Sequence, residues 1–294
     1  MLLEPRLVKL TTRTGIEISR TLPNAKKRMI GAWAFADHFG PTVQVDGMVV
    51  AAHPHTGLQT ATWLIEGSIE HRDSLGTIQH INPGQLNLMT AGHGIAHSEL
   101  SLADAKLLHA VQLWIALPDS ARDMAPAFQH VENPPVVMLG ASQICIFAGE
   151  LFGLRAETQI FSELVGAEVR IPAGEKITLP VDEDFEHGFL VAQGEAHVDQ
   201  DSATVGQMIY LEPGEAEVMV AAGSEDLIFI LLGGTPFEAP MVMWWNFIGR
   251  SHEEIVEMRR AWNSRENRFA EFTDQIGGWT TAPELPNVIL RARN

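Results

Sequence analysis

Short stretches suited to β-strands, separated by turns rich in Gly, Pro, Asn and Asp, fill most of this sequence. Residues 107–117 (LLHAVQLWIAL) are one of the longest, and Pro118-Asp119 follows them directly. Side chains alternate between the two faces of a strand, so Gln112 and Trp114 would share one face of this stretch. Many short strands with frequent turn signals predict an all-β fold.

The two halves of the sequence resemble each other. Residues 62–67 (TWLIEG) are similar to residues 189–194 (FLVAQG), since each is an apolar stretch that ends in glycine. Further along, each half has Gly-Gln followed by an apolar strand, at residues 84–86 and at residues 206–208. Two similar all-β units in tandem explain this repeat most simply.

A proline-containing stretch separates the two halves. Residues 132–135 read Glu-Asn-Pro-Pro, and two prolines remove hydrogen-bond donors and fix the backbone angle φ, as in a linker. We therefore expect one domain over residues 1–134 and a second over residues 135–294.

One helix is expected near the end of the chain. Ser251 and Glu254 have the spacing of a capping box, in which a serine caps a helix three residues before a glutamate. Ile255, Met258 and Trp262 then fall on one stripe of a helix. This helix belongs to the second predicted domain and should pack on one of the β units.

Composition excludes several classes of function. Hydrophobic residues make up 46% of the 294 residues and charged residues 19%, which allows a sizeable core and argues against global disorder. The net charge of −17 repels phosphate groups, so direct binding to nucleic acid is not expected. No apolar run approaches the roughly 20 residues that span a bilayer, so no membrane association is expected.

The N-terminal sequence and the cysteine content favour a cytoplasmic location. Residues 1–6 (MLLEPR) lack the basic and apolar regions of a secretion signal. Cys145 is the only cysteine, so neither an internal disulfide nor a cysteine-based zinc site can form.

Two pairs of residues point to metal chemistry. His53 and His55 are two residues apart, and so are His97 and Glu99. If both segments are strands, each pair projects to one side, and together they offer three nitrogens and one oxygen to a common point. This donor set suits a divalent transition metal with coordination positions left open for substrate or oxygen.

Six of the twelve histidines lie within residues 53–97, which favours a shared role for some of them over independent surface or core positions. His71 and His80 lack a paired ligand and are interpreted as ordinary residues. His93, four residues before His97, could face the pocket and support the ligands from outside, and its role stays open. Trp244 and Trp245 are assigned to the core in preference to a stacking surface for a ligand.

At these residues the sequence resembles the pirin family of the cupin superfamily. The resemblance rests on residues 53–67 (HPHTGLQTATWLIEG), residues 71–76 (HRDSLG) and residues 82–99 (NPGQLNLMTAGHGIAHSE). It implies an all-β bicupin, with two jelly-roll β-barrels in tandem, a C-terminal helix, and metal in the N-terminal barrel only. It also implies that His53, His55, His97 and Glu99 bind one divalent transition metal. Iron is the expected metal, with nickel, cobalt, manganese, copper or zinc as alternatives.

The resemblance also carries expectations about function. Some bacterial pirin-like proteins are quercetin 2,3-dioxygenases, so we expect an oxidoreductase that opens flavonol or related enol substrates with O2. Glu99 would then act as the catalytic base. The alternatives are an iron-dependent redox-sensing regulator that acts through a protein partner, and a structural bicupin without metal. The family fixes the site more firmly than the reaction.

Overall fold

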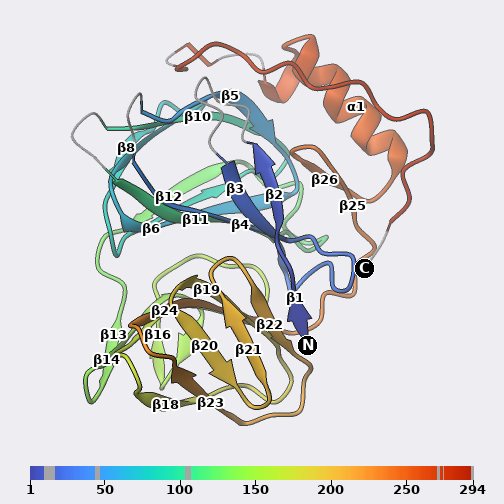
Figure 1. The fold of residues 1–294 in the computed structure, drawn as a ribbon. Helices are drawn as coiled ribbons and strands as arrows, with labels where there is room; N and C mark the ends of the chain where they lie inside the picture. The colour runs from blue at the N-terminus through green and yellow to red at the C-terminus, as the bar shows by residue number, and fades with distance from the viewer. Residues whose placement is uncertain (10–16, 44–46, 103–106, 270–271, 274, 293–294) are drawn as a thin grey trace.

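The computed structural model describes residues 1–9, 17–43, 47–102, 107–269, 272–273 and 275–292, and it folds into two stacked β units (Figure 1). Each unit pairs a seven-stranded antiparallel sheet with a four-stranded one. Apart from one edge strand of each seven-stranded sheet, β12 (Ala127–Val131) in the first unit and the N-terminal β1 (Leu2–Leu3) in the second, the order of strands is the same in both units, so the duplication seen in the sequence is a duplication of topology. The predicted all-β bicupin is confirmed.

The first unit has the seven-stranded order β12-β9-β6-β11-β4-β3-β2 and the four-stranded order β5-β10-β7-β8. Its strands are β2 (Arg6–Lys9), β3 (Glu17–Leu22), β4 (Trp33–Val43), β5 (Val49–His55), β6 (Leu58–Glu66), β7 (Ile69–Asp73), β8 (Ile78–Ile81), β9 (Leu86–Thr90), β10 (Ile95–Ser101), β11 (Leu107–Ala116) and β12 (Ala127–Val131).

The second unit has the corresponding orders β1-β22-β19-β24-β17-β14-β13 and β18-β23-β20-β21. Its strands are β1 (Leu2–Leu3), β13 (Val136–Leu139), β14 (Ser142–Ala148), β17 (Leu164–Ile171), β18 (Lys176–Pro180), β19 (Glu186–Gln193), β20 (Glu195–Val198), β21 (Asp201–Thr204), β22 (Met208–Leu211), β23 (Glu217–Ala222) and β24 (Leu227–Gly234). A short hairpin of β15 (Glu150–Leu151) and β16 (Leu154–Arg155) follows β14.

The glutamine of each repeated Gly-Gln pair makes the same kind of hydrogen bond in both units. The Oε1 atom of Gln85 accepts a hydrogen bond from the backbone N–H of Asn82, at 2.9 Å. The Oε1 atom of Gln207 accepts from the backbone N–H of Thr204, at 2.7 Å. Each glutamine thus closes the turn that leads into the next core strand, which gives the sequence repeat a structural cause.

The two units share one core, because their seven-stranded sheets face each other. Trp33 and Trp63 of the first unit are fully buried there, and Trp63 packs on Phe147 of the second with ring centroids 4.9 Å apart. Trp63 donates its indole N–H to Glu168 of the second unit at 2.8 Å. Burial of an aromatic side chain contributes roughly 1.5–3 kcal/mol, so this interface holds the units together as one body.

The C-terminal segment returns to the first unit. A hairpin of β25 (Val242–Trp244) and β26 (Phe247–Gly249) precedes α1 (His252–Asn263), and η1 (Asn267–Phe269) follows it. Ala52 of β5 and Ala96 of β10 share a buried apolar cluster with this segment, so the helix packs on the four-stranded sheet (Figure 1).

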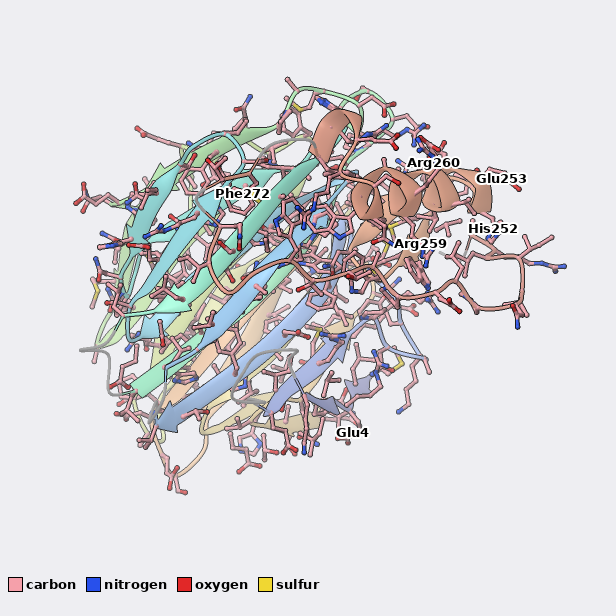
Figure 2. The ribbon with its side chains drawn as sticks, turned by 90° about the horizontal axis from the view of Figure 1, so that it is seen from above. Glu4, His252, Glu253, Arg259, Arg260 and Phe272 are labelled. Atoms are coloured by element: carbon pink, nitrogen blue, oxygen red, sulfur yellow. The ribbon has the colours of Figure 1, made fainter. Side chains whose placement is uncertain are left out.

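The predicted helix begins where its capping box places it. The Oγ atom of Ser251 accepts from the backbone N–H of Glu254 at 3.2 Å. The residues Ile255, Met258, Ala261 and Trp262 face the sheet and are buried. The charged Glu253 and Arg260 lie on the exposed side of the helix (Figure 2).

Two segments cross the division between the units. The N-terminal strand β1 pairs with β22 of the second unit, and the C-terminal helix packs on the first. The proposed boundary at residues 134 and 135 falls between β12 and β13 and stays a proposal. Within the described part of the chain, α1 is too short and too polar to cross a membrane.

Candidate metal centre

Strands β5 and β10 bring three histidines together. The two strands pair antiparallel, with His53 opposite His97 and His55 opposite Ile95. The Nε2 atoms of His55 and His97 are 3.1 Å apart, and the ring of His53 lies 4.3 Å from that of His97 between centroids. The ligand atoms of the three residues all lie within 4.8 Å of one another, as a common ion requires.

The protonation of these rings suits a metal. Burial lowers the pKa of His53 to about 4, and it holds the pKa values of His55 and His97 well below the usual range. All three imidazoles are therefore neutral at pH 7 and keep a lone pair. His53 donates its Nδ1–H to the carbonyl of Ala51 at 2.9 Å. Its Nε2 atom therefore carries the lone pair that can bind a metal. Neutral nitrogens that converge in this way fit a divalent transition metal.

Glu99 lies at the edge of this group. The pairing of β10 with β5 shifts register between His97 and Glu99, and the carboxylate Oε1 is 3.9 Å from Nδ1 of His97. Burial raises the pKa of Glu99, and the electrostatic interaction with His71 opposes that effect. The structure thus groups Glu99 most closely with His97 and His71, and its assignment as a fourth ligand stays a proposal.

His71, which the sequence indicates to be an ordinary residue, lies in the same site. It stands opposite Glu99 on the neighbouring strand β7, and its Nδ1 is 3.4 Å from Nδ1 of His97. Its Nε2 is 3.2 Å from Oδ2 of Asp73, and both residues are buried. The sequence signal was available, because His71 and Asp73 have the same two-residue spacing as the other two pairs.

The remaining histidines of this region lie elsewhere. His93 donates its Nδ1–H to the carbonyl of Met124 at 2.9 Å and is not among the described residues that line the cavity. The suggestion that it faces the pocket is therefore not supported. His80 is half-exposed and pairs with Glu70 at 2.8 Å, in agreement with its interpretation as an ordinary residue.

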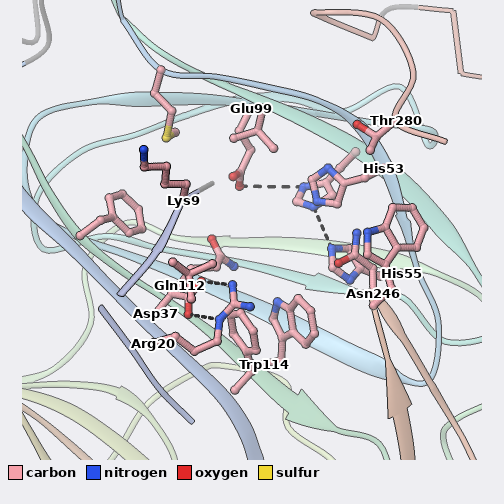
Figure 3. Close-up of a pocket in the computed structure, with 17 residues that line it drawn as sticks. Lys9, Arg20, Asp37, His53, His55, Glu99, Gln112, Trp114, Asn246 and Thr280 are labelled. Atoms are coloured by element: carbon pink, nitrogen blue, oxygen red, sulfur yellow. Dashed lines mark hydrogen bonds and ion pairs between the residues drawn. The ribbon is translucent and has the colours of Figure 1, made fainter. Parts of the chain in front are cut away.

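The three histidines form one wall of a cavity of about 270 Å³ (Figure 3). Phe35 and Trp114 also line it and stack with ring centroids 4.0 Å apart, and Trp114 packs edge-on against the ring of His55 at 5.1 Å. Arg20 binds Asp37 through two hydrogen bonds of 2.7 Å and places its guanidinium 4.4 Å from the centre of the Phe35 ring. The cavity therefore combines a cluster of histidine nitrogens with aromatic and charged side chains.

The C-terminal segment completes the cavity. Trp245 and Asn246 line it from the turn between β25 and β26, and Thr280 lines it from the segment after the helix. Trp245 also packs in the apolar cluster beneath α1, as does Trp244. The assignment of both tryptophans to the core therefore holds for Trp244, whereas Trp245 faces the cavity as well.

Two family models match this chain. The model for pirin matches residues 15–115, and the model for the pirin C-terminal cupin domain matches residues 166–270. The chain belongs to the pirin family. The predicted resemblance is confirmed, and the match covers both units.

Bacterial relatives agree with this assignment. A Pseudomonas aeruginosa protein, provisionally assigned as a quercetin 2,3-dioxygenase, is 43% identical over 276 residues, which span 92% of this chain and 87% of that protein. A pirin-like protein of Caulobacter vibrioides is 35% identical over 260 residues, which span 85% of this chain and 89% of the relative.

Solved structures share the fold. A quercetin 2,3-dioxygenase from Acinetobacter baumannii superposes with a TM-score of 0.94 at 39% identity, over 99% of this chain and 97% of that chain. A bacterial pirin from Escherichia coli, solved in complex with nickel(II), superposes with a TM-score of 0.61 at 17% identity, over 81% and 99% of the two chains. At 17% identity, the similarity to the Escherichia coli protein shows only that the fold is shared.

Proposed function

We propose that this pirin-family protein is a metal-dependent dioxygenase that opens flavonol or related enol substrates with O2. One observation carries the proposal: three neutral imidazoles converge at a cavity that Phe35, Phe39, Trp114 and Trp245 also line. The relatives support an oxidoreductase of this type, since two of them carry the name quercetin 2,3-dioxygenase.

We assign His53, His55, His97 and Glu99 as the residues that hold one divalent transition metal, with iron as the expected ion. A metal bound there would supply a Lewis acid for an enol oxygen and an electron path to O2. His71 and Asp73 would orient His97 and Glu99 from the side away from β5.

The protein's own residues provide the other parts of catalysis. Glu99 is the carboxylate nearest the three histidines, and its raised pKa strengthens it as a base. It would take the proton from the substrate hydroxyl at Oε1 and hold it during ring opening. The stacked rings of Phe35 and Trp114 would hold a flat substrate, and Trp245 would exclude water from the site.

The test is aerobic incubation of the metal-loaded protein with quercetin, with separate loading of iron, nickel, cobalt and manganese. We expect the flavonol absorbance to fall while O2 is consumed and carbon monoxide is released. If none of the four metals gives turnover, the dioxygenase proposal is wrong for this substrate class.

Glu99→Gln provides the matched variant for the base, because it keeps the shape of the side chain and removes its basicity. Loss of a general base typically lowers turnover by about 10²-fold or more, and we expect that loss in kcat. His80→Ala serves as the control, since His80 is half-exposed and lies outside the cavity lining. Equal turnover in Glu99→Gln and the wild type would remove Glu99 from the mechanism.

The alternative of an iron-dependent redox-sensing regulator with a protein partner stays a prediction, as does the cytoplasmic location. The net charge of −17 favours a protein partner over DNA if the protein does regulate transcription. Comparison of the proteins captured by the ferrous and ferric forms tests this alternative, because a dioxygenase needs no partner.

A further inference from the structure

The second unit contains a cavity of its own. A cleft of about 1010 Å³ lies where β17 and β19 begin and where β18 ends, beside the β15–β16 hairpin. In the shared topology, β17 and β18 occupy the places of β4 and β5, which line the metal cavity in the first unit. The second unit therefore has an open cavity at the corresponding end of its barrel, although no metal ligands are predicted there.

His187 is the polar group in this cleft that lacks a partner. It is 1% exposed, and among the described residues its Nε2 has no hydrogen-bond partner. It lies opposite Gly233 on β24, where an added Cβ would come within 2.9 Å of its Cδ2 atom. A side chain at position 233 would therefore displace the imidazole. Since buried polar groups are normally paired, an unpaired one beside a cavity indicates a ligand.

Aromatic side chains line the same cleft as this histidine. Phe152, Phe161 and Phe185 line the cleft and are only half-buried, and the ring of Phe185 lies 6.3 Å from that of His187 between centroids. Phe152 also has a φ of 53° at the tip of the β15–β16 hairpin, where asparagine or glycine is normally preferred. An unfavourable backbone angle that keeps an aromatic ring at a cavity is typical of a binding site.

The charges around the cleft select against anions. Glu163 and Asp182 line it and are exposed, while the exposed Arg155 is paired with Glu150 at 3.2 Å. Burial lowers the pKa of His187 to about 4, so its ring is neutral at pH 7 and has one N–H and one lone pair. A hydroxyl group can both donate and accept, and it can therefore pair with Nε2 in either tautomer.

We propose that this cleft binds a small uncharged phenol, with its hydroxyl on Nε2 of His187 and its ring against Phe152, Phe161 and Phe185. The site is separate from the candidate metal centre and does not depend on the proposed reaction. A ligand with a carboxylate would be repelled by Glu163 and Asp182. An aliphatic ligand would lack a flat ring to stack on the phenylalanines.

The test is titration of the full-length protein with 2-naphthol at pH 7, followed by the NMR signals of isotope-labelled histidine rings. We expect the His187 ring signals to shift and to saturate with naphthol. His55→Ala, which alters only the first cavity, should leave that shift unchanged. No shift of the His187 ring at saturating naphthol would overturn the proposal, because the unpaired nitrogen would then bind water instead.

Variants separate binding from folding. His187→Leu should weaken the binding of naphthol about fivefold or more, since it removes the hydrogen bond at similar volume. His197→Leu is the matched control, because His197 is a half-exposed histidine of the same unit outside the cleft lining. Phe152→Asn should also weaken binding while the thermal midpoint of unfolding stays close to that of the wild type, because asparagine tolerates a positive φ. Wild-type affinity in folded His187→Leu, or in Phe152→Asn if the first variant does not fold, would overturn the proposal.

Discussion

At the scale of single residues, His97 decides how the candidate site is organised. Its Nε2 faces His55 and its Nδ1 faces Glu99 and His71, so one ring joins the histidine group to the carboxylate. This position makes His97 the residue whose loss should disturb the site most. Its ring is neutral at pH 7 because burial and the neighbouring histidines hold its pKa well below the usual range.

Removal of either central histidine should release the metal and leave the fold intact. We expect His55→Ala and His97→Ala to retain a small fraction of the metal bound by the wild type, because each loses one of three converging nitrogens. Metal analysis of protein purified without chelator measures this, and circular dichroism reports the fold. His80→Ala is the control. Global unfolding of either variant would show that the metal has a structural role.

At the scale of elements, the strand pair β5–β10 is supported from outside by α1. The helix buries Ile255 and Trp262 against a cluster that includes Ala52 and Ala96, and both alanines are neighbours of metal-site histidines in the chain. Ala52 and Ala96 point away from the cavity because alternate residues of a strand face opposite sides. The helix therefore holds the outer face of the strands whose inner face carries the site.

Loss of the helix cap should lower stability by a small and predictable amount. Ser251→Ala removes the acceptor for the backbone N–H of Glu254, and such caps contribute about 1 kcal/mol. Urea denaturation should therefore show a lower free energy of unfolding. Val256→Ala, at an exposed helix position, should have little effect. Equal stability of Ser251→Ala and the wild type would mean that water replaces the cap.

At the scale of the whole molecule, the two units are joined by their largest apolar cluster. Trp33 donates its indole N–H toward the carbonyls of Val165 and Gly233, at 3.2 and 3.1 Å, and both acceptors belong to the other unit. Gly31 approaches Gly234 so closely that an added Cβ would lie 2.7 Å from its Cα. Backbone contact of this kind leaves no room for independent motion of the units.

The units should therefore unfold together. Trp63→Ala leaves a cavity at the shared core and removes the donor to Glu168, which typically costs about 3–5 kcal/mol. Calorimetry should show one transition for the wild type and one, at a lower temperature, for the variant. Two separate transitions in the wild type would contradict the shared core.

Acid should destabilise the molecule over a defined range of pH. Burial lowers the pKa of His38 to about 3 and that of His109 to about 4, and their Nε2 atoms are 2.9 Å apart. The unfolded chain, in which histidine titrates near pH 6.5, then binds more protons than the folded one between pH 6.5 and 4. Stability should be full above pH 6.5 and fall as the pH decreases through this range.

Each such histidine contributes a slope of up to about 1.4 kcal/mol per pH unit within that range. Urea denaturation between pH 7 and pH 4.5 measures the slope. His38→Gln should make it shallower, because it removes one of the two buried rings. A flat profile in the wild type would show that these rings take up protons in the folded protein as readily as in the unfolded chain.

Local features of the sequence determined a large part of this structure. The helix begins at Ser251 and the turns close on Gln85 and Gln207, because caps and turns depend on neighbours a few residues away. The spacing of His53 and His55 set them on one side of a strand for the same reason.

The tertiary structure alone decided which distant side chains complete each cavity. The register of β7 against β10 placed His71 opposite Glu99, and the return of the C-terminal segment placed Trp245 at the metal cavity. Contacts of this kind depend on which strands pair and on how a long connection packs. The local alternation of side chains predicts neither. The sequence by itself therefore determined the family, the duplicated β topology and the candidate ligand pairs, whereas packing between strands far apart in the chain decided the rest of the candidate site.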